Sequence, residues 1–292
     1  MTYPDLQFFE SEVVALVDKV LDAVKEKNFE NYVLLIARGG YQYEVEHTFL
    51  SPYVIASRQE IYLDRTREMF LVTYLNNYAS FLKDGIFMTN EYKEYDLNIQ
   101  MMIYAQIWES HQFLKTLKRI GDILTGKPYE WKIPFEKMDK NGVMRPVHRG
   151  NMIQEQILKT LKQVSPEFAR FIESVYDGQL RNDFAHASYY ISIEDNAIMS
   201  LDSERFSIKK KTDLFDWEQM FIYSVLLSYH LPHSMQERCR SFKEDYPNLD
   251  YVEVDWPSYK EPGKILRVRV RPEKRGEEIE FNFVKQRKAE GK

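Results

Sequence analysis

Two long stretches bounded by helix start and stop signals, residues 51–83 and 91–125, constrain the fold of this chain more than any other feature. The first begins with a serine followed by Pro52, a capping residue and a proline in the first turn, and it ends at Gly85. The second ends at a glycine shortly before Pro128. Helices of this length must bury their apolar sides against other elements. The sequence therefore predicts an antiparallel helical pair at the centre of a mainly α fold.

Shorter helices are predicted on both sides of this pair. Residues 4–27 carry apolar side chains at helical spacing, which predicts an N-terminal helix. Further helices are predicted over residues 151–163 and 166–177, and from either Asp213 or Asp216 onward. Residues 127–150 are rich in proline and glycine and are interpreted as a long ordered loop, with a role in covering a substrate or binding a partner as the alternative.

Alternating apolar residues predict two β-hairpins. The first joins residues 190–193 to residues 198–201 across an acidic turn. The second joins residues 266–270 to residues 277–284 near the end of the chain, after a strand over residues 251–255. Both hairpins are small additions to a helical fold.

Three arginines alternate with the apolar residues of the C-terminal hairpin, namely Arg267, Arg269 and Arg271. They either pair with acidic residues across the strands or form a basic ladder for RNA phosphates. The formal net charge of −5 favours pairing, because it argues against a generally basic surface for nucleic acids. Any contact with RNA must therefore be local.

The composition indicates a globular chain without internal cross-links. Of the 292 residues, 44% are hydrophobic and 29% are charged, which is ordinary for a globular protein. The single Cys239 excludes an internal disulfide and a zinc site built from several cysteines. Neither a signal peptide nor a run of membrane-spanning length is found. We therefore expect a cytoplasmic protein with no membrane partner.

A short predicted helix after Gly178 holds an arginine and a histidine with four residues between them, Arg181 and His186. At 100° per residue these two side chains lie 140° apart around the helix. Asn182 and His186, at i and i+4, share a side of the helix, and the long stem of Arg181 lets its guanidinium swing toward them. The alternative is a structural histidine and a solvated arginine.

The residue types in this motif suit the cleavage of RNA. Histidine titrates near neutrality, so His186 can take a proton from a ribose 2′-hydroxyl or return one to the leaving 5′-oxygen. Arginine stays charged and holds phosphate oxygens through a planar fork, so Arg181 can stabilise the charge that develops in the transition state.

With Asn182 after the arginine, the segment from Arg181 to His186 resembles the signature of the HEPN family, small helical proteins many of which are metal-independent ribonucleases. The resemblance implies a homodimer in which two copies of the motif helix meet, with Arg181, His186 and Asn182 as catalytic residues, RNA as substrate and no cofactor. It also implies a toxin or phage-defence effector, with an antitoxin or regulatory partner. The alternative is a non-catalytic HEPN-like module for dimerisation or nucleotide binding.

The chain departs from one pattern in this family. HEPN toxins that are silenced by nucleotide transfer carry a tyrosine two residues after the histidine, where this chain has Ser188, and Tyr189 comes one position later. That mode of control is therefore not expected here. The resemblance divides the chain into an N-terminal helical extension (1–50), a HEPN-like helical core (51–243) and a C-terminal β-hairpin appendage (244–292).

Two further sets of residues are candidates for function. Lys209, Lys210 and Lys211 form a basic cluster, interpreted either as an RNA contact or as a solvated turn. Glu109 and His111 are of catalytic or metal-binding type, but no ligand spacing supports a metal site, and we expect Glu109 to pair with a positive neighbour.

The pair at residues 148–149, His148 and Arg149, either contacts RNA or belongs to an ordinary loop. His230 and His233 lie near the end of a predicted helix with a proline between them. No third ligand is close in sequence, so a metal site at these histidines is not expected.

Overall fold

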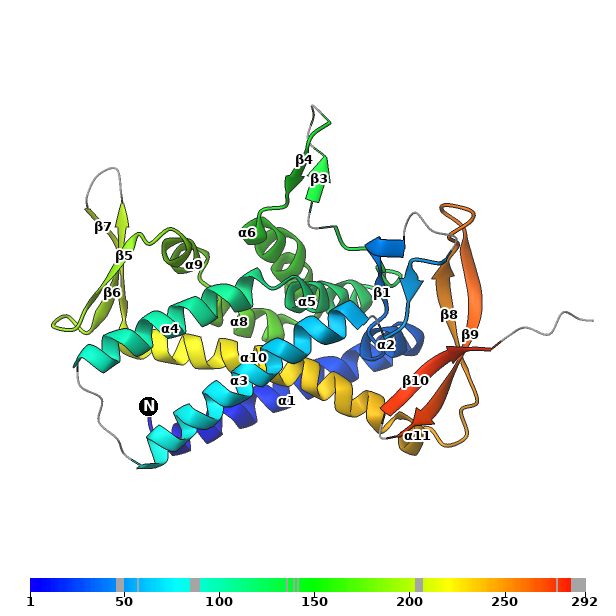
Figure 1. Cartoon of the computed structure of the whole chain (residues 1–292), viewed down its shortest axis with the longest axis horizontal. Coiled ribbons are helices and arrows are strands. Elements are labelled where there is room, and N and C mark those ends of the chain that lie inside the picture. Colours follow the sequence, from blue (N-terminus) through cyan, green and yellow to red (C-terminus); the bar gives the residue numbers. More distant parts are fainter. Residues whose placement is uncertain are drawn as a thin grey trace, which may run out of the picture.

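The computed structural model describes residues 1–45, 50–56, 58–84, 90–134, 136–138, 140, 142–202, 207–276 and 278–284. Its helices form an elongated body, and one small three-stranded antiparallel sheet lies toward each end (Figure 1). The prediction of a mainly α fold with small antiparallel sheets is therefore confirmed.

Helix α1 (Tyr3–Lys27) packs along α10 (Leu214–Arg240). Polar contacts tie the two helices together at both ends. The amino group of Met1 lies 2.9 Å from the carboxylate of Glu218, and Arg238 bonds Asp18 at 3.0 Å and Asp22 at 2.6 Å. Residues 3–27 thus contribute to the same core as the later helices, and the predicted division at residue 50 stays a prediction.

The prediction of one helix over residues 91–125 is wrong, because α4 (Asn90–Glu109) and α5 (His111–Leu124) are separate. The chain between them is extended at Ser110, whose hydroxyl accepts a hydrogen bond from the backbone N–H of Phe113 at 3.3 Å. Serine is a preferred capping residue, so it starts a new helix here. The predicted end of α5 is confirmed, since Gly126 follows it with φ +82°.

Helix α3 (Arg58–Asp84) begins seven residues after the predicted start at residue 51. The chain before it forms strand β2 (Tyr53–Val54), which pairs with β1 (Gly40–Tyr41). The backbone N–H of Gln42 donates to the carbonyl of Pro52 at 2.8 Å and extends this pairing. The backbone partners of this segment therefore lie outside any helix, which overrides the Ser-Pro start signal.

Residues 149–175 form the helices that lead to the predicted motif. α6 (Arg149–Asn151), a π-helical segment (Met152–Leu158) and α7 (Lys159–Val164) follow one another, so the predicted helix over 151–163 is confirmed. α8 (Pro166–Val175) and α9 (Gly178–Ala185) come next. The other short elements are α2 (Phe29–Ile36), η1 (Tyr43–Val45), β3 (Glu136–Met138), β4 (Met144–Pro146) and α11 (Phe242–Asp245).

The sheet after α9 contains the predicted hairpin and one more strand. β5 (Tyr189–Ser192) pairs with β6 (Ala197–Asp202), as the alternation of apolar residues predicts. β7 (Ser207–Asp213) pairs with the other edge of β6 and carries the three lysines. The interpretation of this cluster as a turn is therefore wrong, because its backbone completes a sheet.

The C-terminal sheet has the order β8–β9–β10, from β8 (Val252–Pro257), β9 (Ile265–Arg275) and β10 (Glu278–Phe283). Arg267 bonds Asp255 at 2.9 Å, and Arg269 bonds Glu253 at the same distance. These two arginines therefore pair with acids across the strands, which is the alternative that the net charge favours.

Candidate functional site

Helix α9 is held firmly at its first turn. The carboxylate of Asp177 accepts hydrogen bonds from the backbone N–H groups of Gln179 and Leu180, both at 2.9 Å, so this residue caps the helix. The hydroxyl of Tyr104, in α4, accepts from the backbone N–H of Asp177 at 2.8 Å and donates to the carbonyl of Val175 at 3.1 Å. Complete burial raises the pKa of Tyr104 well above its usual value, so it stays a neutral donor.

Leu180 and Phe184 give α9 its apolar side, as their spacing predicts. Leu180 is fully buried. The ring of Phe184 makes edge contacts with Trp217 and Tyr104, at centroid distances of 5.1 and 6.1 Å. Since these aromatic rings belong to α10 and α4, the orientation of α9 is set by the core.

Arg181 is buried, with 7% of its surface exposed, and is therefore not the solvated arginine of the alternative interpretation. Its Nη1 forms an ion pair with Oε1 of Glu109 at the end of α4. In the part of the chain that the structure describes, no hydrogen bond joins Arg181 to the side chain of His186 or Asn182. The structure thus brings Arg181 to Glu109 and leaves His186 at the other end of α9.

His186 follows the last residue of α9 and is exposed. Its backbone N–H donates to the carbonyl of Asn182, a half-buried residue, at 3.0 Å. The next residue, Ala187, has φ +52°, and the N–H of Ser188 bonds the carbonyl of Asp183 at 2.9 Å. These two backbone hydrogen bonds fix the chain around His186, whose side chain is exposed to solvent.

The sequence indicated Glu109 and His111 as one candidate set and Arg149, with His148, as another, and it linked neither set to the motif. In the structure, Glu109 Oε2 lies 3.5 Å from Arg149 Nε, while its Oε1 pairs with Arg181. Arg149 also contacts Nε2 of His111 and donates to the carbonyl of Val147 at 2.9 Å. The expectation that Glu109 pairs with a positive neighbour is confirmed, and it pairs with two.

We call Glu109, His111, Arg149, Tyr176 and Arg181 the arginine cluster. They come from the end of α4, the start of α5, the start of α6, the residue after α8, and α9. Ser110 is the residue from which part of the cluster could have been predicted. A helix break at this serine places Glu109 at the end of one helix and His111 at the start of the next. The break itself depends on capping, which the apolar spacing does not reveal.

The charges of the arginine cluster favour an anion. Two guanidinium groups face one carboxylate, Glu109, so positive charge is in excess. Burial lowers the pKa of Arg149, and the neighbouring Arg181 lowers it further, while Glu109 opposes the shift. Burial likewise raises the pKa of Tyr176, against the opposing effect of Arg181.

Several buried polar atoms in the cluster have no well-aligned hydrogen bond among the described residues, although the Arg181 side chain lies close enough to the Tyr176 hydroxyl to oppose the rise in its pKa. They are Nε and Nη2 of Arg181 and the hydroxyl oxygen of Tyr176. A Cβ added at Gly178 would lie 3.1 Å from that hydroxyl, and one at Gly150 3.6 Å, so two glycines let backbone approach it. Buried donors without partners are costly, so a ligand that accepts hydrogen bonds from them would be stabilised at this place.

The three predicted RNA-binding lysines are all exposed on β7. Lys210 forms an ion pair with Asp177, the residue that caps α9. Because side chains alternate along a strand, Lys211 lies on the opposite side of the sheet from Lys210, whereas Lys209 lies at an irregularity in the pairing of β6 with β7. Only Lys210 is therefore placed at the motif helix, and the RNA contact of all three stays a prediction.

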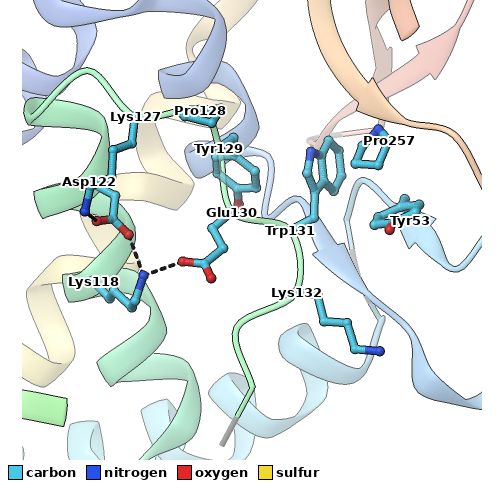
Figure 2. A pocket seen from close by; sticks show the side chains of 10 residues that line it. All are labelled: Tyr53, Lys118, Asp122, Lys127, Pro128, Tyr129, Glu130, Trp131, Lys132 and Pro257. Carbon is cyan, nitrogen blue, oxygen red and sulfur yellow. Dashed lines mark hydrogen bonds and ion pairs between the residues drawn. The ribbon is translucent and has the colours of Figure 1, made fainter. Parts of the chain in front are cut away.

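A cavity of about 450 Å³ lies elsewhere in the fold, and no motif residue lines it. Figure 2 shows the side chains that line this cavity. Lys118 reaches Asp122 at 2.6 Å and also pairs with Glu130, while Lys127 reaches Asp122 at 2.8 Å. The charged groups on this side of the cavity therefore already neutralise one another. The full lining is Tyr53, Lys118, Asp122, Lys127, Pro128, Tyr129, Glu130, Trp131, Lys132 and Pro257.

Among the described residues, no group of three or more His, Cys, Asp or Glu side chains is arranged to hold a metal ion. None of the helices that the structure describes combines the length and the apolar character needed to cross a membrane. Comparison with known proteins gave no match to any family model, curated protein or solved structure.

Proposed function

We propose that this chain is a metal-independent endoribonuclease of HEPN type that acts as a toxin or phage-defence effector. The observation that supports it best is that the short helix α9 carries a buried arginine in a positively charged cluster and is followed directly by an exposed histidine. These are the groups that RNA cleavage through the 2′-hydroxyl requires: a phosphate-binding cation and an acid–base catalyst.

In the proposed reaction, His186 takes the proton of the ribose 2′-hydroxyl, and the 2′-oxygen forms a bond to phosphorus. The bond from phosphorus to the 5′-oxygen breaks, and the leaving oxygen takes a proton from a second imidazolium. The products are a 2′,3′-cyclic phosphate and a 5′-hydroxyl. Arg181 stabilises the negative charge on the phosphoryl oxygens, and the amide of Asn182 orients the substrate.

Two chains form the complete site in this proposal. Arg181 and His186 are about 7.5 Å apart along the helix axis and 140° apart around it, so one α9 does not direct both groups at a single phosphate. Ala185, His186 and Ala187 are exposed in succession, and the two alanines are small enough to let a second α9 approach. A two-fold axis there would gather two histidines and supply the second imidazole.

The lysines on β7 extend the proposed RNA contact. Lys209 and Lys211 are exposed on the sheet that follows α9, and their charges offset the acidic balance of the chain locally. Lys210 adds a cation at the first turn of α9 through its pairing with Asp177.

A second candidate function is a non-catalytic HEPN-like module for dimerisation or nucleotide binding. The burial of Arg181 and its ion pair with Glu109 favour this alternative, since a catalytic arginine must reach the substrate. In this alternative His186 and its flanking alanines only form an interface with a second copy or with an antitoxin or regulatory partner.

A substrate with one ribose in an otherwise DNA oligonucleotide separates the two functions. The ribonuclease cleaves only after the ribose and leaves a 2′,3′-cyclic phosphate, which mass spectrometry identifies. The non-catalytic module leaves the oligonucleotide intact. Cleavage of the all-DNA oligonucleotide would contradict the proposed use of the 2′-hydroxyl.

A further inference from the structure

The arginine cluster has an arrangement that the motif alone does not explain. The two carboxylate oxygens of Glu109 are divided between two guanidinium groups, Oε1 toward Arg181 and Oε2 toward Arg149. A phosphate diester offers two non-bridging oxygens that can be divided in the same way. The carboxylate therefore has the charge and the bonding pattern of a bound phosphate.

We propose that Arg149 and Arg181 form a binding pair for a backbone phosphate of RNA, and that the carboxylate of Glu109 occupies the place of this phosphate until RNA binds. The proposal rests on the proposed function for the identity of its ligand. It adds Arg149 as a phosphate-binding residue and Glu109 as an internal competitor, neither of which belongs to the motif.

The exposed fractions of the three side chains support an exchange of anions. The side chain of Glu109 is 41% exposed, whereas those of Arg149 and Arg181 are 14% and 8% exposed. Glu109 is also the last residue of α4, directly before the break at Ser110. Its carboxylate can therefore turn toward solvent while the two arginines stay in place.

The donors without partners support a larger anion than a carboxylate. Glu109 uses one nitrogen of Arg181, and the buried Nε and Nη2 have no well-aligned hydrogen bond among the described residues, their nearest polar neighbour being the hydroxyl of Tyr176. A phosphate has more oxygens than a carboxylate and can accept from these groups as well. Binding would thus satisfy donors that the unliganded site leaves unsatisfied.

Binding of a fluorescent single-stranded RNA tests this proposal in the His186→Ala background, where no cleavage is expected. Glu109→Gln should bind RNA about threefold to tenfold more tightly, because the competing negative charge is gone. Arg149→Ala should bind about tenfold more weakly, and the slope of log Kd against log salt should fall by about 0.7. Glu253→Gln and Arg269→Ala are matched controls on the C-terminal sheet and should change neither quantity.

Weaker binding by Glu109→Gln, to the same degree as by Arg149→Ala, would overturn the proposal, since the carboxylate would then only hold the arginines in position. If Glu109→Gln lowers the unfolding midpoint below the assay temperature, the Arg149→Lys variant tests whether Arg149 binds phosphate. It keeps the charge and loses the planar fork, so severalfold weaker binding is expected with an unchanged salt slope. Equal RNA affinity with lysine and with arginine at position 149 would contradict the proposed phosphate-binding pair.

The source of the phosphate and the proposed function are tested separately. A DNA oligonucleotide of the same sequence should respond to Glu109→Gln and Arg149→Ala as RNA does, because the pair reads phosphate. Protection against heat by inorganic phosphate without any binding of RNA would overturn the RNA assignment. If the variants bind RNA as expected but the parent chain does not cleave it, the proposed phosphate-binding pair is supported and the proposed ribonuclease activity is contradicted.

Discussion

Replacing Glu109 with alanine should lower the free energy of unfolding by about 2 kcal/mol. The variant leaves the buried guanidinium of Arg181 without its carboxylate and places it beside a second cation, Arg149. Breaking a fully buried ion pair costs about 3–5 kcal/mol, whereas an exposed pair contributes about 0–1 kcal/mol. The pair of Glu109 and Arg181 lies between these limits, because Arg181 is buried and Glu109 is partly exposed.

Urea denaturation followed by circular dichroism measures this loss, and the thermal midpoint should fall by about 4–8 °C. A double-mutant cycle with Arg181→Ala isolates the pair, with an expected coupling energy of about 1–2 kcal/mol. Glu253→Ala is the matched control, since its partner Arg269 is exposed, and it should cost less than about 1 kcal/mol.

A loss below about 0.5 kcal/mol for Glu109→Ala, together with no coupling to Arg181→Ala, would refute this reasoning. The arginine cluster would then be open to solvent and would not be a buried site. In combination with the RNA-binding test, we expect an uncommon result for Glu109→Gln: a less stable chain that binds RNA more tightly.

Three further predictions follow from named side chains. Arg181→Lys should abolish RNA cleavage in a gel assay, because a point charge cannot replace the guanidinium fork, and retained activity would contradict its role. Ala187→Glu should shift the chain toward monomer in light scattering and remove cleavage, because it sets like charges across the two-fold axis; a fully active monomer would contradict the composite site. Burial lowers the pKa of His230, although Glu10 lies 3.2 Å from its Nε2. The unfolded state therefore binds the proton more readily, and the free energy of unfolding should fall as pH drops through about 6.5. His230→Gln should reduce this pH dependence in denaturant titrations, and an unchanged dependence of the unfolding free energy on pH would contradict the role of His230.

Local signals were sufficient to predict α9 and its surroundings. Asp177 caps the helix as its position before Gly178 indicates, and the Leu180 and Phe184 spacing gives the buried side correctly. These features depend on residues within one or two turns of each other. The hairpin of β5 and β6 is predictable for the same reason.

The arginine cluster could not be predicted, because it depends on contacts between distant segments. Glu109 is 72 residues from Arg181, and nothing in the sequence links them. The break at Ser110 could not be predicted from the helical residues on both sides of it, because a single serine is also tolerated inside a helix. Strand β7 was missed because three successive lysines do not alternate, and pairing with β6 decides its structure.

We propose that His186 catalyses the cleavage of RNA without a metal. Total RNA incubated with purified parent chain and with His186→Ala, each with and without EDTA, tests it most directly. We expect cleavage by the parent in both conditions and a loss of about 100-fold or more for His186→Ala, with an unchanged unfolding midpoint because the side chain is exposed. Equal cleavage by the two chains, or cleavage lost in EDTA and restored by one metal, would contradict the claim.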